Sequence, residues 1–113
     1  MKVNEAVDAL GALAHESRLE VHRLLVRRGP EGFTPGELAE RLGIPAPTLS
    51  FHLKELQRVG LVLVRREGRF LYYTANFPRT HGLVEYLTEN CCSLSATASE
   101  CRPAMERAAR KRA

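Results

Sequence analysis

The chain has 113 residues, a formal net charge of +4 and three cysteines. This length predicts a single domain, and no apolar run approaches the roughly 18–20 residues of a membrane-spanning helix. The first residues show neither the apolar segment nor the cleavage site of a signal peptide, so we expect a cytoplasmic protein without a membrane partner. An odd cysteine count without an export signal argues against a disulfide framework and favours reduced thiols, available for a soft metal or for redox chemistry.

The positive charge is unevenly distributed. Residues 1–101 carry equal numbers of acidic and basic side chains, so the excess lies in the Arg-rich residues 102–113. Within the balanced part, basic side chains outnumber acidic ones between residues 46 and 69. A locally basic strip on a neutral body is typical of a surface that binds phosphates.

The first predicted helix spans residues 3–13. Its apolar stripe contains Val3, Val7 and Leu10, because helical positions three or four apart share a face. The stripe is short and is accompanied by alanines. This helix could therefore pack on the core of its own chain or on a partner helix.

A second helix is predicted over residues 16–28, with the inward-facing side chains Leu19, Val21, Leu24 and Leu25. Gly29-Pro30 is expected to end this helix in a turn. His15 and His22 lie near this helix. We interpret each as a cap or surface residue, because neither has a metal-ligating partner four positions on.

The next segment shows the pattern of a helix-turn-helix. Thr34 and Glu37 have the spacing of a capping box, with Pro35 at the first helical position. The helix that they begin is predicted to face inward with Leu38, Ala39 and Leu42. A short connection over residues 43–45 then leads into another helix, which is the helix-turn-helix order.

That next helix, residues 46–59, is the element around which the chain is organised. Its apolar face is formed by Leu49, Leu53, Leu56 and Val59. The opposite face carries side chains that bind phosphates and base edges, namely Thr48, Ser50, His52, Lys54 and Arg58. This division of the two faces predicts a DNA-recognition helix.

Two strands are predicted next, over residues 61–66 and 69–75, which are rich in β-branched and aromatic residues. Glu67-Gly68 is the expected hairpin turn, with glycine supplying a positive φ. The hairpin would form a wing with a basic tip, made by Arg65, Arg66 and Arg69. Such a tip could contact only solvent, but beside a recognition helix it lies within reach of the next phosphates.

The last helix is predicted from residue 79 to about residue 90, with an apolar surface of Leu83, Val84, Tyr86 and Leu87. His81 is interpreted as a surface residue. Residues 93–99 are small and polar, as in a flexible linker. We therefore expect residues 1–92 to form a DNA-binding and dimerisation domain, and residues 93–113 to form a flexible tail that carries Cys101.

Three stretches resemble the ArsR/SmtB family of metal-responsive transcriptional repressors: ALAHESRLEVHRLL, ELAERLGIPAPTLSFHLKELQRVGLV and RREGRFLYYT. The resemblance covers residues 4–90. It implies a mostly helical α+β fold, a winged helix-turn-helix with about five helices, a two-stranded β-hairpin wing and a homodimer through the first and last helices. It also implies contacts with operator DNA from Thr48, Ser50 and His52 in the recognition helix, beside Lys54, and from Arg66 and Arg69 in the wing.

The chain departs from the family's pattern in two ways. Where the family often has a serine cap and a glutamine, this chain has Pro45 and Ala46, so a different operator sequence is expected. The family's thiol pair in the DNA-binding motif and its last-helix zinc site are also missing. The cysteines that remain resemble an arsenic-responsive subgroup with three C-terminal thiols; they are Cys91, Cys92 and Cys101.

Three thiolates suit trivalent arsenic, which is thiophilic and keeps a lone pair. On a regular helix Cys91 and Cys92 would point about 100° apart, so both can bind one ion only if the helix end frays. Cys101 would have to fold back or come from the partner subunit. The resemblance thus implies a homodimeric repressor, without an organic cofactor, that leaves its operator DNA when As(III) or Sb(III) binds.

Other interpretations of the cysteines stay open. The same fold could sense oxidants, with Cys101 pairing to Cys91 or Cys92, or it could respond to cadmium, lead or zinc. Cys91 and Cys92 could also be small apolar residues in a dimer interface. An enzyme is not expected, because a helix C-terminus opposes thiolate formation and the chain contains no CxxC motif.

Overall fold

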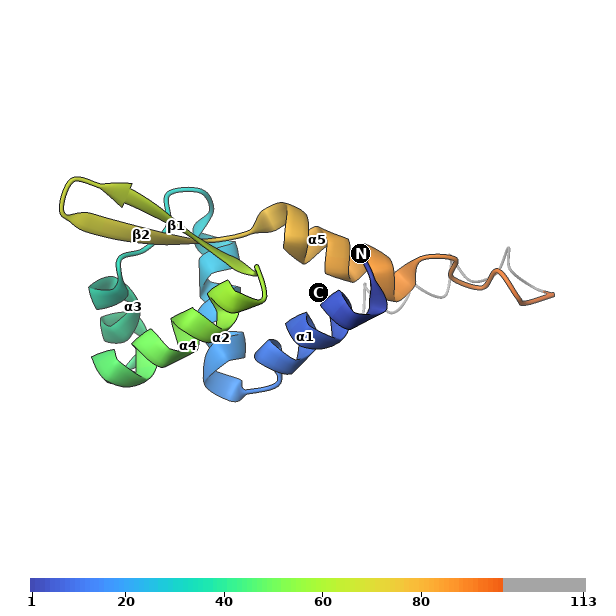
Figure 1. The fold of residues 1–113 in the computed structure, drawn as a ribbon, viewed down its shortest axis with the longest axis horizontal. Coiled ribbons are helices and arrows are strands. Elements are labelled where there is room, and N and C mark those ends of the chain that lie inside the picture. The colour runs from blue at the N-terminus through green and yellow to red at the C-terminus, as the bar shows by residue number, and fades with distance from the viewer. Residues whose placement is uncertain (97–113) are drawn as a thin grey trace.

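The computed structural model describes residues 1–96, and the structural statements below concern these residues. In chain order the elements are α1 (Val3–Leu13), α2 (Glu16–Arg28), α3 (Pro35–Leu42), α4 (Ala46–Arg58), β1 (Val62–Glu67), β2 (Phe70–Ala75) and α5 (Phe77–Thr88). The hairpin of β1 and β2 lies at one end of the molecule, and α1 packs beside α5 at the other (Figure 1). The predicted five helices and two-stranded antiparallel hairpin are confirmed.

The first four helices begin where the sequence predicts, but α5 does not. It starts at Phe77, two residues before the predicted Arg79, and it ends at Thr88. The Asn76 side chain caps it by accepting a hydrogen bond from the backbone N–H of Arg79 at 3.3 Å. Pro78 fits the first turn, where its missing N–H has no intrahelical acceptor. The Asn-Phe-Pro segment therefore starts the helix.

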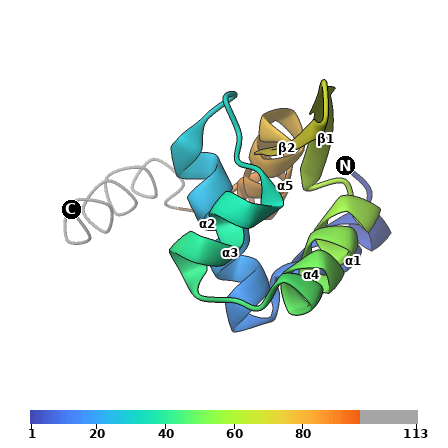
Figure 2. The ribbon, with the colours of Figure 1, turned by 90° about the vertical axis from the view of Figure 1, so that its left-hand side faces the viewer.

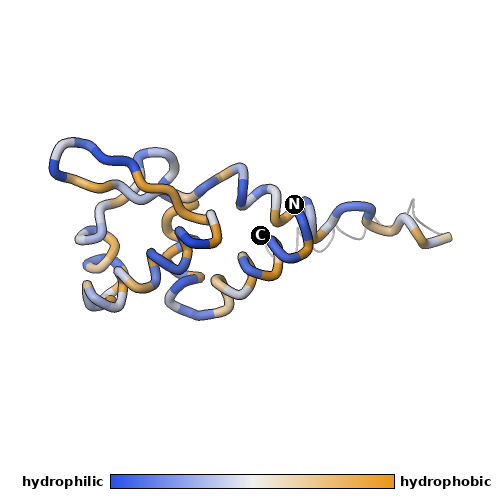
Figure 3. Tube along the Cα trace, viewed as in Figure 1, coloured by the Kyte–Doolittle hydropathy of each residue, from blue (hydrophilic) through white to orange (hydrophobic). Residues whose placement is uncertain are grey.

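The core lies where α2, α3 and α4 meet the base of the hairpin. The predicted inward face of α4 is buried, as are Val21 and Leu25 of α2 and Leu38 of α3. The hairpin is hydrophobic at its base and hydrophilic at its tip (Figure 3). Leu19 is exposed, so its predicted inward position is wrong. No helix within residues 1–96 has the length and apolar character needed to span a membrane.

Helix α1 separates its small and large apolar residues onto different faces. Its inward face consists of alanines, which are Ala6, Ala9 and Ala12. The stripe predicted from the sequence, Val3, Val7 and Leu10, is exposed. On the neighbouring helix α5, Val84 and Leu87 are exposed as well. Two adjacent helices thus present large apolar side chains that their own chain leaves uncovered.

His22 is buried, with 5% of its surface exposed, so its interpretation as a cap or surface residue is wrong. Its Nε2 lies 3.1 Å from the Thr80 hydroxyl oxygen. That hydroxyl donates its own hydrogen to the Asn76 carbonyl oxygen, so it accepts the hydrogen bond from His22. Burial lowers the pKa of His22 below its ordinary value of 6.5.

This burial predicts that the protein loses stability in mild acid. The unfolded chain takes up a proton near pH 6.5 while native His22 resists protonation, so stability is complete above that pH and falls below it. In His22→Gln, which keeps a donor for Thr80, the decline of unfolding free energy between pH 7.5 and 5.5 should be shallower. One proton contributes a slope of at most about 1.4 kcal/mol per pH unit.

The measurement is urea unfolding across this pH range. His81→Gln is the matched control, because His81 is an exposed histidine of α5, and its slope should equal that of the wild type. An unchanged slope in His22→Gln would contradict the assignment.

Candidate nucleic-acid interface and thiol pair

Helix α4 presents a polar surface away from the core. Thr48, Ser50 and Lys54 are exposed on it. Arg58 is exposed too, and its Nη2 pairs with Glu55 Oε2 at 3.1 Å, a surface ion pair that contributes little stability and leaves the arginine available. Ser50, Lys54 and Arg58 follow one another at four-residue intervals and so offer a hydroxyl and two cationic groups in one strip, with Thr48 exposed near the start of the helix. Such a strip can enter a DNA groove.

The N-terminus of α4 has no side-chain cap. Pro45 occupies the N-cap position and makes no side-chain hydrogen bond there, in agreement with the loss expected from the sequence. The first backbone N–H groups of a helix have no intrahelical acceptor, and the helix dipole favours anions at this end. The α4 N-terminus can therefore receive a phosphate oxygen directly.

His52 does not belong to this polar surface, and the sequence-based placement is wrong. Only 5% of the His52 surface is exposed. Its ring lies 4.7 Å from that of His15, and its Nδ1 lies 3.4 Å from Arg18 Nη1. Burial first, then His15 and Arg18, lower the pKa of His52 below its ordinary value. In this position the imidazole faces His15 and Arg18 and is covered from solvent.

The sequence analysis missed the role of Arg18 and the contact of His15 with His52. His15 is the N-cap of α2, accepting a hydrogen bond from the Ser17 backbone N–H at 3.1 Å, which agrees with its interpretation as a cap. Its position just before the helix could have indicated this. Arg18 gave no local signal, because its partner in α4 lies 34 positions away in the sequence.

The wing is anchored at one side and exposed at its tip. Glu67 pairs with Phe70, so the turn residues are Gly68 and Arg69, one position later than predicted. Gly68 has the positive φ, 60°, that such a turn requires. Arg66 and Arg69 are exposed at this tip. Their guanidinium groups can therefore contact phosphates beside a groove.

Arg65 anchors the wing to the loop after α2. It donates hydrogen bonds to the carbonyl oxygens of Pro30 and Glu31 at 3.0 and 3.1 Å, and it lies over the Tyr72 ring. The same loop passes so close to β2 that a Cβ at Gly32 would lie 2.6 Å from the Tyr73 carbonyl oxygen. Arg65 therefore fixes the wing's direction, and it is not a free cation at the tip.

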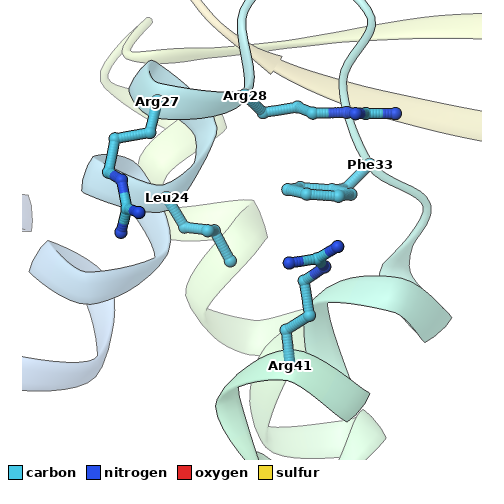
Figure 4. A pocket seen from close by; sticks show the side chains of 5 residues that line it. All are labelled: Leu24, Arg27, Arg28, Phe33 and Arg41. Carbon is cyan, nitrogen blue, oxygen red and sulfur yellow. The ribbon is translucent and has the colours of Figure 1, made fainter.

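Two other arginines hold α2 and α3 together around one ring. Arg28 and Arg41 lie over Phe33 at 4.8 and 4.9 Å from the ring centroid, on opposite faces of the ring (Figure 4). Arg28 also donates to the Gly32 carbonyl oxygen at 3.0 Å. Leu24 and Arg27 complete the lining of the shallow hollow beside them. These contacts give the arginines a role in the fold.

Two predicted thiols come together just after α5. The helix ends at Thr88, before the cysteines. Asn90 and Cys92 adopt left-handed backbone conformations with φ of 57° and 62°. The sulfurs of Cys91 and Cys92 consequently lie 3.6 Å apart, and they do not diverge as they would on a regular helix. Two sulfurs at this separation could bind one ion if both were thiolates.

The rest of the predicted thiol site is not seen in the described residues. Cys101 lies outside them. Within residues 1–96 no group of three or more His, Cys, Asp or Glu side chains is placed to hold a metal. Cys92 is disulfide-bonded in this structure, so a site made of thiolates requires reduction first.

The chain matches a helix-turn-helix domain family over residues 13–65. It is 34% identical to the transcriptional activator HlyU of Vibrio cholerae, over 78% of this chain and 79% of HlyU. It is also 34% identical to the biofilm growth-associated repressor of Xylella fastidiosa, over 81% of this chain and 78% of that protein.

Solved structures agree with these relatives. An ArsR-like transcriptional regulator from a Rhodococcus species superposes with a TM-score of 0.68 at 25% identity, over 94% of this chain and 93% of that one. A homodimeric winged helix-turn-helix DNA-binding domain from Mycobacterium bovis superposes with a TM-score of 0.59 at 28% identity, over 79% and 82% of the two chains.

If the α4 surface binds DNA, removing its lysine should weaken binding to any duplex. Lys54→Ala should lower affinity for specific and unrelated DNA alike and reduce the slope of log affinity against log salt by about 1, the effect of one lost phosphate contact. Fluorescence anisotropy at several salt concentrations measures both, using a duplex that the wild-type protein selects from a random-sequence pool. Arg23→Ala, at an exposed arginine of α2, is the control. If the slope of log affinity against log salt is unaltered in Lys54→Ala, Lys54 does not contact a DNA phosphate.

Proposed function

Because the chain belongs to the ArsR-like winged helix-turn-helix transcriptional regulators that include HlyU and the biofilm growth-associated repressor, we propose that it is a homodimeric repressor induced by As(III) or Sb(III). In this proposal the inducer binds Cys91, Cys92 and Cys101, and the dimer then leaves its operator. The relatives are named as regulators of transcription and not as enzymes, in line with the expectation from the sequence.

Dimer formation is supported by the uncovered apolar residues of α1 and α5. Val7 and Leu87 are 61% and 58% exposed in the single chain, and the two helices lie next to each other. Contact with the same helices of a second copy would bury both rows, which is favourable at roughly 25 cal/mol per Å² of apolar surface. A homodimeric neighbour of the same fold is consistent with this arrangement.

The dimer would present two copies of α4 to DNA. Each copy would enter a major groove with its exposed face, and each wing would contact the flanking phosphates. A two-fold dimer reads the same sequence twice in opposite directions, so the operator is an inverted repeat. Residues exposed on α4, Thr48 and Ser50 among them, would contact the base edges.

The observation that carries the thiol part of the proposal is the convergence of two sulfurs directly after α5. Cys91 and Cys92 place their sulfurs 3.6 Å apart, and soft thiolates select soft ions. Cys101 would supply the third sulfur from its own tail or from the partner's. Because α5 belongs to the proposed dimer contact, binding at its end changes the spacing of the recognition helices. Coupling of this kind is typically about 1–3 kcal/mol.

The inducer can be identified by titrating the complex of reduced protein and operator DNA with candidate ions and measuring how much DNA is released. Arsenite and antimonite should dissociate the wild-type complex, and cadmium, lead and zinc serve as competing candidates in parallel titrations. A triple variant, Cys91→Ser, Cys92→Ser and Cys101→Ser, should bind the operator as tightly as the wild type and resist release. Release by arsenite that persists in the triple variant would refute the thiol site.

The dimer contact is tested by placing a charge in it. Val7→Glu should raise the dimer dissociation constant by about two orders of magnitude or more, because an uncompensated buried charge costs about 3–5 kcal/mol. Operator affinity should fall with it. Val26→Glu, at a valine of α2 that is 38% exposed, is the matched control. Sedimentation velocity gives the association state, and a Val7→Glu protein that remains a dimer would exclude this contact.

A thiol redox sensor is the second candidate, favoured by the disulfide at Cys92. One solved relative is described as reduced HlyU. Dilute peroxide should then release DNA in the absence of any metal, and a phosphine reductant should restore binding. If peroxide has no effect and arsenite releases DNA under reducing conditions, the redox proposal is excluded and the metalloid proposal is supported.

A further inference from the structure

Two side chains at the start of α2 each contact one buried side chain of α4. The three residues are His15, Arg18 and His52, and we call them the clamp. We propose that the clamp positions the recognition helix α4 against α1, so that operator affinity depends on side chains that do not touch DNA. The proposal rests on the DNA-binding role of α4 and is independent of the thiol site.

Arg18 holds two elements with one guanidinium group. Its Nε donates a hydrogen bond to the Ala12 carbonyl oxygen at 2.6 Å. Ala12 lies in the last turn of α1, where carbonyl oxygens have no intrahelical donor. The Arg18 Nη1 lies 3.4 Å from His52 Nδ1 in α4. The end of α1 and the middle of α4 are therefore connected through one side chain from α2.

The hydrogen-bonding roles in the clamp are fixed by chemistry. Arginine only donates, so His52 Nδ1 accepts and the proton of its neutral ring is on Nε2. His15 Nδ1 likewise accepts from a backbone N–H. The His52 ring is thus neutral in this arrangement, and it packs against the His15 ring at 4.7 Å with a 48° tilt. A protonated His52 would lose its acceptor and face the Arg18 cation.

The clamp lies between the surface that binds DNA and the helix that we expect to dimerise. Helix α4 packs on both α1 and α2, and seen from the wing end α1 and α4 lie together on one side of the molecule (Figure 2). A movement of α4 relative to α1 would lengthen the hydrogen bonds that Arg18 makes with Ala12 and His52. In a dimer, the same two hydrogen bonds of Arg18 would set the distance of each recognition helix from the two-fold axis of the dimer.

A double-mutant cycle separates positioning from direct contact. Arg18→Lys keeps the charge and loses the rigid fork, and His52→Leu keeps bulk and loses the acceptor. Each should lower operator affinity by about three- to tenfold, and the double variant should lose no more than the weaker-binding single variant, because both act through one bond. His52→Asn, with an oxygen at the place of Nδ1, should retain most of the affinity.

Two further readouts distinguish the clamp from DNA contacts. The salt slope of every clamp variant should equal that of the wild type, because no phosphate contact is lost. The loss should also be the same on operators substituted at any single base pair. A reduced slope, or a loss confined to one base pair, would show that the side chain contacts DNA and would overturn the proposal.

A purely structural role is tested in the same samples. Urea midpoints and the dimer fraction are measured for each variant, and affinity is compared where all proteins are folded dimers. His81→Leu and Arg23→Lys are the controls, at exposed positions of the same residue types. Lower midpoints with unchanged operator affinity, or additive losses in the cycle, would contradict positioning. If His52→Leu fails to fold, Arg18→Lys and His52→Asn provide the comparison.

Discussion

The burial of one face of α4 is the constraint on which the rest of the structure depends. Leu49, Leu53 and Leu56 are almost inaccessible, and each fully buried leucine contributes about 1.5–3 kcal/mol relative to an exposed one. A helix whose inward face is fixed in this way has its outward face fixed too. The backbone of Thr48 and Lys54 is thereby held at a defined position, which a DNA-reading surface needs.

Helix α1 meets two requirements by dividing its residues according to size. Alanines face inward, which allows α1 to approach the core closely, while valine and leucine face outward. An ion pair then ties α1 to α5, with Glu5 Oε2 2.8 Å from Arg79 Nη1. The hydrogen bond from Arg79 is the main reason why the pKa of Glu5 is lowered. The two helices thus form one unit.

Side-chain contacts connect α5, which precedes the cysteines, to the recognition helix. Cys91 and Cys92 follow α5, Arg79 of α5 pairs with Glu5 of α1, and the last turn of α1 accepts a hydrogen bond from Arg18. Arg18 in turn reaches α4. The three side-chain contacts in this series, Arg79 with Glu5, Arg18 with the Ala12 carbonyl oxygen and Arg18 with His52, are polar and directional.

The sequence by itself determined the order of the elements, most helix bounds and the inward face of α4, because periodicity and caps such as Thr34 with Glu37 are local. Only the tertiary structure decided which polar residues are buried. His22 and His52 are held by Thr80 and Arg18, residues 58 and 34 positions away, and no local pattern contains such partners. The convergence of Cys91 and Cys92 likewise required a left-handed backbone after α5, which neighbouring residue types do not specify.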